Sequence, residues 1–177
     1  MRFPSHTPDT AVGKAADLLG DIVERNGSAG TMVRTMAGSA SVLAGYLDLS
    51  RAMKRSKLDR HLSERISLAV QDRLGCGLCL QAHTSAAMAL GISDDEIIRA
   101  REGGSADERI RAVVAFGRRV YTDPSSISDD DVIDLRLLGL SDRETLDIVG
   151  LVALNVLTGT FNLVAGLRLE INTRQVA

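Results

Sequence analysis

Apolar residues recur along most of this chain at intervals of three and four, the period of one face of an α-helix. The clearest stretch runs from Leu58 to Leu74, where leucine, isoleucine and valine follow at four-residue spacing. No segment shows the apolar–polar alternation of a half-buried strand. The pattern therefore predicts an all-α protein, with helices over residues 10–24, 39–53, 58–74, from 76 or 78 to 90, and 107–121.

Serine residues mark where later helices begin. Ser93 with Glu96, and Ser141 with Glu144, have the spacing of a capping box. Ser128 precedes three aspartates, whose negative charge is favourable at the positive end of a helix. The two capping boxes lie in the similar segments LGISDDE and LGLSDRE. We expect the same helix–turn–helix geometry at both places.

The segment from Ile148 to Ala165 contains no charged residue and reaches the length of a short membrane span. It also contains two asparagines, two threonines and two glycines. A helix that is apolar on all sides is usually buried in protein. We therefore expect a core or subunit-interface helix in a homo-oligomer, and no membrane association.

Composition limits the possible functions of the chain. Its 177 residues are typical of one domain, and we expect a single domain over residues 1–177. A net charge of −2, the absence of Trp and an aromatic content of 3% argue against nucleic-acid binding. The first ten residues contain no apolar run, so we expect no secretory signal and a cytoplasmic protein.

A short basic cluster is the strongest sequence feature for a binding module instead of an enzyme. Its members are Arg51, Lys54, Arg55, Lys57 and Arg60. Because acidic residues elsewhere balance them, we interpret the cluster as a solvated helix end, not a nucleic-acid contact.

The segment RLGCGLCLQAHT carries the candidate chemistry. Cys76, Cys79 and His83 stand at positions i, i+3 and i+7, which share one helix face. Two cysteines three apart in a helical turn have Cα atoms about 5–6 Å apart, as a disulfide requires. A helix N-terminus favours the thiolate, which is the reactive form of cysteine. The spacing therefore favours a reversible dithiol–disulfide pair.

Glu64 is a candidate partner for the histidine. It lies in the middle of the helix predicted before the cysteines and can point toward the next helix. A carboxylate–imidazole–thiol chain moves a proton off a nucleophile. Because Cys79 is i,i+4 to His83, we expect Cys79 to be the attacking thiol and Cys76 to be the resolving thiol. A water that extends the relay to Cys76 would reverse these roles.

The same donors leave a metal site as an alternative. Cys76, Cys79 and His83 could bind zinc, with His61 or Glu64 as a fourth ligand. Structural zinc pairs more often lie on loops and have a second, distant pair. We therefore expect neither a metal nor another cofactor.

Taken together, these motifs resemble the AhpD-like alkylhydroperoxidase branch of the carboxymuconolactone decarboxylase family. The main resemblance is the spacing Glu64–x11–Cys76–x2–Cys79–x3–His83. The segments LSERISLA, AHT, GISDDEI and VALNVLTGTFNLVAGL also look like this family, and the likeness covers about residues 39–171. In place of the His or Tyr often found between the cysteines in this family, the chain has Leu78.

The resemblance implies an all-α bundle that assembles as dimers, trimers or hexamers. It also implies a thiol peroxidase or disulfide reductase with an antioxidant role, in which a Glu–His relay activates the cysteine pair. The disulfide would be reduced by an external dithiol of the lipoyl or thioredoxin-like type. The decarboxylase branch of the family lacks the cysteine pair, and a decarboxylase-like enzyme is the remaining alternative.

Overall fold

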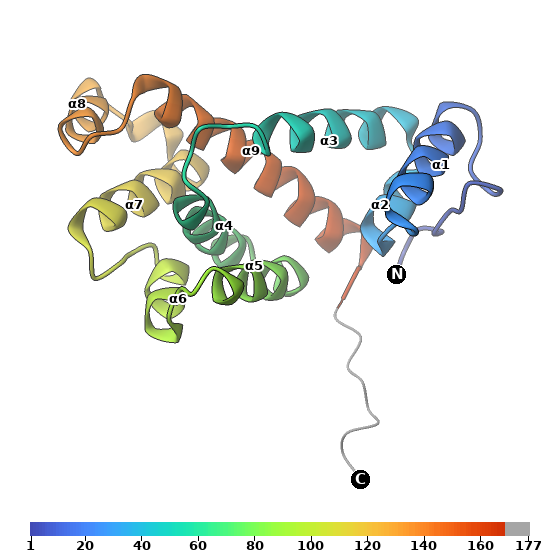
Figure 1. Cartoon of the computed structure of the whole chain (residues 1–177), viewed down its shortest axis with the longest axis horizontal. Helices are drawn as coiled ribbons and strands as arrows, with labels where there is room; N and C mark the ends of the chain where they lie inside the picture. The colour runs from blue at the N-terminus through green and yellow to red at the C-terminus, as the bar shows by residue number, and fades with distance from the viewer. Residues whose placement is uncertain (169–177) are drawn as a thin grey trace, which may run out of the picture. The chain divides into compact units, whose positions relative to one another are not determined.

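Helices account for the regular structure of residues 1–168, the part of the chain that the computed structural model describes (Figure 1). No strand occurs among these residues, which confirms the predicted all-α class. The elements are α1 (Lys14–Asn26), α2 (Thr31–Met36), α3 (Ala40–Met53), α4 (Arg60–Leu74), α5 (Gly77–Ala89), α6 (Asp94–Arg101), α7 (Glu108–Thr122), the 3-10 turn η1 (Pro124–Ser126), α8 (Asp129–Leu137) and α9 (Asp142–Ala165).

The sequence pattern located most helices but not the first segment of the chain. The start of α1 is at Lys14 instead of residue 10, because residues 7–11 form hydrogen-bonded turns around Thr7 and Thr10. The short helix α2 was not predicted, since glycine and serine between Gly27 and Gly30 obscure its beginning. Its six residues are too few to show a helical period.

The two similar segments form the same turn. Gly91 and Gly139 both adopt the left-handed conformation, with φ of 79° and 84°, and in each turn the next N–H bonds to the carbonyl five residues earlier. The capping box before α9 is complete: Ser141 N–H donates to Glu144 Oε2 at 2.9 Å, and Glu144 N–H donates to Ser141 Oγ at 3.2 Å. These predictions are confirmed.

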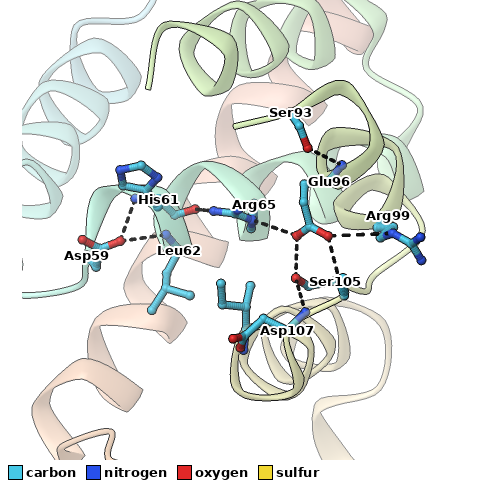
Figure 2. Close-up of polar contacts among 11 residues, drawn as sticks. Asp59, His61, Leu62, Arg65, Ser93, Glu96, Arg99, Ser105 and Asp107 are labelled. Atoms are coloured by element: carbon cyan, nitrogen blue, oxygen red, sulfur yellow. Dashed lines mark hydrogen bonds and ion pairs between the residues drawn. The ribbon is translucent and has the colours of Figure 1, made fainter. Parts of the chain in front are cut away.

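The capping box expected before α6 is only half correct. Ser93 Oγ accepts the Glu96 N–H at 3.4 Å, but the Glu96 carboxylate turns away (Figure 2). It accepts hydrogen bonds from Ser105 Oγ at 2.5 Å and Ala106 N–H at 2.9 Å, and its Oε2 lies 3.7 Å from Nε of the buried Arg65. Glu96 therefore links α4, α6 and the start of α7 instead of closing its own helix.

Contacts divide the described chain into two compact units. In the unit Gly45–Thr160, α4 packs against α5, α6 and α7. Gly117 allows the close approach of α7, because a methyl group there would lie 2.7 Å from Ile66 Cγ2. The core cluster around this contact is Leu58, Leu62, Ile66, Ala69, Val70, Val113, Val114, Phe116, Leu135, Leu140, Ile148 and Val152.

The other unit consists of residues 1–44 and the described part of 161–177. Leu19, Met36 and Leu43 are its largest buried side chains. Arg2 fastens the chain start by donating its N–H to the Ala165 carbonyl at 2.8 Å. The division does not test the expected single domain over residues 1–177, which remains a prediction.

In the described residues α9 is the one helix that is long and apolar enough to cross a membrane, although a third of its most apolar window is buried. Ile148 and Val152 point into the core, whereas Leu146 and Val149 are 70% and 45% exposed. Other residues of the chain therefore cover only one face of α9. The expectation of a helix covered on all sides holds only if another molecule covers the second face.

Candidate functional site

A tight turn between α4 and α5 carries the two cysteines. Gly75 ends α4 with a left-handed φ of 78°, and α5 begins two residues later. The Gly75 and Cys76 N–H groups both donate to the Gln71 carbonyl, at 3.0 and 3.2 Å. Cys76 is the N-cap of α5, and its Sγ accepts the Cys79 N–H at 3.4 Å. Both cysteines therefore lie at the helix start, where free N–H groups favour a thiolate.

Cys76 and Cys79 form a disulfide, with their Cα atoms 5.4 Å apart. The distance agrees with the range expected from their i,i+3 spacing. Only 2% of Cys76 and 7% of Cys79 is exposed, while the neighbouring Gly75 and Gly77 are exposed. Both cysteines are therefore buried, and Cys76 is the less exposed of the two.

Glu64 and His83 meet between α4 and α5. Glu64 Oε2 lies 2.8 Å from His83 Nδ1, a hydrogen-bond distance. The side chains are 14% and 28% exposed, so both are largely shielded from water. A carboxylate at Nδ1 fixes the orientation of the imidazole and leaves Nε2 to exchange a proton. His83 lies one helical turn after Cys79 in α5, within reach for an i,i+4 pair.

A buried polar network anchors the cysteine turn, and sequence reasoning did not identify it. Gln71 Nε2 donates to both the carbonyl and the side-chain oxygen of Asn155 in α9, each at 2.9 Å. Asn155 Nδ2 in turn donates to Ser67 Oγ at 3.0 Å. Because the Gln71 carbonyl holds Cys76, the network links α9 to the disulfide. The one available signal was an asparagine within an uncharged helix.

A cavity of about 450 Å³ opens beside the Glu64–His83 pair. It lies within the larger unit and has a size typical of small-molecule sites. Neither cysteine lines it in the disulfide form. The lining residues are Ser50, Met53, Lys54, Ser56, Leu58, Arg60, Ser63, Glu64, His83, Leu151 and Leu154.

The geometry does not assemble the donors of the alternative zinc site. Over residues 1–168, no three or more His, Cys, Asp or Glu side chains come together in a group that could hold a metal ion. The proposed fourth ligand His61 is exposed in the first turn of α4 (Figure 2). Both sulfurs are also engaged in the disulfide.

Residues 40–118 match the model of the carboxymuconolactone decarboxylase family. Over this segment the chain is similar to that family. It runs from α3 into α7 and contains Glu64, both cysteines and His83. The resemblance to this family that the cysteine motif suggested is therefore confirmed over this segment. No curated protein gave a significant match.

Solved structures extend the likeness beyond the family segment. An alkylhydroperoxidase AhpD core, a peroxidase-related protein of Ralstonia eutropha JMP134, matches with a TM-score of 0.81 and 18% identity over 96% of this chain and 92% of that one. A peroxidase-related protein of Silicibacter sp. TM1040 matches with a TM-score of 0.69 and 19% identity over 88% and 83% of the two chains. The fold is thus AhpD-like, as predicted.

The debrominase Bmp8 shares the fold as well. Its apo structure matches with a TM-score of 0.70 and 17% identity, over 89% of this chain and 87% of that chain. At such identity the likeness concerns the fold alone. A shared helical framework does not fix the chemistry, which depends on the residues of each site.

Proposed function

We propose that this protein is a thiol-dependent hydroperoxide reductase that cycles Cys76 and Cys79 between dithiol and disulfide. The observation that carries the proposal is the combination of two contacts on one helix. The cysteines at the start of α5 lie at disulfide distance, and one turn later His83 bonds to Glu64. A closed disulfide beside a carboxylate–imidazole pair combines a redox couple with a group that moves protons.

The first step consumes the peroxide. His83, held by Glu64, takes the proton from the Cys79 thiol, and the thiolate attacks the terminal oxygen of the hydroperoxide. The O–O bond breaks, the proton passes to the departing alkoxide, and an alcohol forms. Cys79 becomes a sulfenic acid. The sulfur loses two electrons and the peroxide gains two.

The second step closes the cycle within the site. The Cys76 thiol attacks the Cys79 sulfenic acid, the S–S bond forms, and water leaves. The Cα separation of 5.4 Å permits this without movement of α5 as a whole. An external dithiol, of the lipoyl or thioredoxin-like type, then reduces the disulfide by thiol–disulfide exchange. We also propose that the protein is a homo-oligomer in the cytoplasm. It would have no nucleic-acid or membrane partner.

The debrominase fold relative and the family name suggest other reactions for this framework. A reductive debromination would also oxidise the cysteine pair to the disulfide. A decarboxylation would leave both thiols unchanged. Loss of free thiols on reaction with substrate therefore separates the proposed activity from a decarboxylase.

The test starts with fully reduced protein and one equivalent of an organic hydroperoxide. We expect two free thiols per chain to disappear, one equivalent of alcohol to form, and mass spectrometry to locate the disulfide between Cys76 and Cys79. The Cys76→Ser/Cys79→Ser variant is the control and should leave the peroxide intact. Unchanged thiols in the wild type after complete mixing with peroxide would contradict the proposal.

A further inference from the structure

The cavity beside His83 has one apolar wall. Met53, Leu58, Leu151 and Leu154 line this side, contributed by α3, α9 and the segment between α3 and α4. Leu58 belongs to the buried core, so this wall is fixed by packing. Hydrogen peroxide has no apolar surface to bury against this wall. A hydrocarbon chain that binds here removes its apolar surface from water, which favours binding.

The polar side of the cavity is positively charged. Lys54 and Arg60 line it, and both side chains are exposed. Neither forms an ion pair with any residue in the described part of the chain. The one carboxylate in the lining, Glu64, is already bonded to His83. The cavity therefore presents two cations without a protein counter-ion.

We propose that this cavity selects hydroperoxides that carry a carboxylate on a hydrocarbon chain, such as fatty-acid hydroperoxides. This assignment rests on the proposed function. The carboxylate would lie at Lys54 and Arg60, and the chain would lie along Leu58, Leu151 and Leu154. The peroxide group would lie toward His83, one turn from Cys79. The reaction is the one given above: the hydroperoxide becomes a hydroxy acid, and the thiol pair becomes a disulfide.

The positive charges of the cavity and its apolar wall recognise different parts of the substrate. The two cations raise the affinity for an anionic substrate over its neutral methyl ester by about tenfold at low salt. Because both cations are solvent-exposed, this preference falls as the salt concentration rises. The apolar wall acts equally on acid and ester, so their ratio isolates the contribution of Lys54 and Arg60.

The kinetic test compares linoleic acid hydroperoxide with its methyl ester, using kcat/KM at low salt and concentrations below micelle formation. We expect a ratio of about ten for the wild type and a ratio below one for Lys54→Glu/Arg60→Glu, where two negative charges repel the acid. The matched control is Arg111→Glu/Arg143→Glu, which changes the net charge equally at exposed positions outside the cavity. It should keep the wild-type ratio. A wild-type ratio of one, or a control that loses it equally, overturns the proposal.

A binding test separates this inference from the proposed function. The oxidised protein cannot turn over, so calorimetry with the hydroxy-acid product and its methyl ester measures recognition alone. Tighter binding of the acid, lost in Lys54→Glu/Arg60→Glu, supports the cavity assignment even if the reduced protein does not consume peroxides. Equal binding of acid and ester contradicts the assignment even if peroxide reduction is observed.

Discussion

Glu64 and His83 stand 19 positions apart in the chain, yet Glu64 Oε2 lies 2.8 Å from His83 Nδ1. The contact joins the second turn of α4 to the middle of α5 beside the cavity. His83 lies one helical turn after Cys79, so the hydrogen-bonded pair is next to the redox-active cysteines. Removing either partner therefore tests whether the pair moves a proton or only holds two helices together.

The first prediction concerns this relay. Glu64→Gln keeps a polar partner for His83 but removes the charge, and we expect about a tenfold slower oxidation of the thiols by hydroperoxide. His83→Gln removes the proton acceptor and should slow oxidation about 100-fold or more. Stopped-flow measurement of disulfide formation gives both rates.

The control for the relay is a strong thiol oxidant in excess, with the extent of disulfide formation as the readout and not its rate. Excess diamide should still close the disulfide completely in both variants, which shows that the cysteines remain correctly placed. Glu108→Gln, an exposed carboxylate on α7, should leave the rate with hydroperoxide unchanged. A wild-type peroxide rate in His83→Gln would show that the helix terminus alone activates the thiol.

The second prediction assigns the order of attack. Cys79 is the cysteine one turn from His83 and is the more exposed of the two. We expect Cys76→Ser to accumulate a trapped sulfenic acid on Cys79 after peroxide addition, and Cys79→Ser to react about 100-fold more slowly. Mass spectrometry after trapping identifies the modified sulfur. Rapid trapping on Cys76 in the Cys79→Ser variant reverses the assignment.

The third prediction concerns the uncovered face of α9. Leu146 and Val149 are 70% and 45% exposed in a helix that has no charged residue after Asp147. We expect the wild type to be a homo-oligomer and Leu146→Lys/Val149→Lys to shift it toward monomer, because charge on an apolar interface is costly. Light scattering at micromolar concentration measures the mass. Ile133→Lys on α8, where the residue is 46% exposed, is the control.

The fourth prediction concerns acid stability. Burial opposes ionisation of Glu96, but hydrogen bonds from Ser105 and Ala106, with the charges of Arg65 and Arg99, hold the pKa of Glu96 below its ordinary value of 4.5. A lowered pKa in the folded state adds stability above the unfolded pKa, and this stability is lost as pH falls through the folded pKa. We expect Glu96→Gln to lower the free energy of unfolding by about 1.5–3 kcal/mol at pH 7.

Urea unfolding across pH checks this prediction. The difference between wild type and Glu96→Gln should be largest near neutral pH and shrink below about pH 4.5, as the wild-type carboxylate becomes protonated. Glu108→Gln, which removes an exposed carboxylate of the same kind, should show little difference at any pH. A difference that does not depend on pH would mean that Glu96 acts through packing and not through its charge.

Patterns of neighbouring residues in the sequence determined where several helices and turns lie. The four-residue apolar spacing from Leu58 fixed the position of α4, and the Ser141–Glu144 capping box fixed the start of α9. The distance between Cys76 and Cys79 also follows from local geometry, because residues three apart at a helix start are always close. A glycine that must adopt a positive φ explains why both LGxSD segments form the same turn.

Contacts between helices decided the rest. The sequence made Glu64 a candidate partner for His83, but only the packing of α4 against α5 brought the two within hydrogen-bond distance. Glu96 had the spacing of a capping box, yet the buried Arg65 and Ser105 offered its carboxylate stronger partners (Figure 2). The cavity likewise depends on α3, α4, α5 and α9 together. Such contacts join residues far apart in the chain, and no local period encodes them.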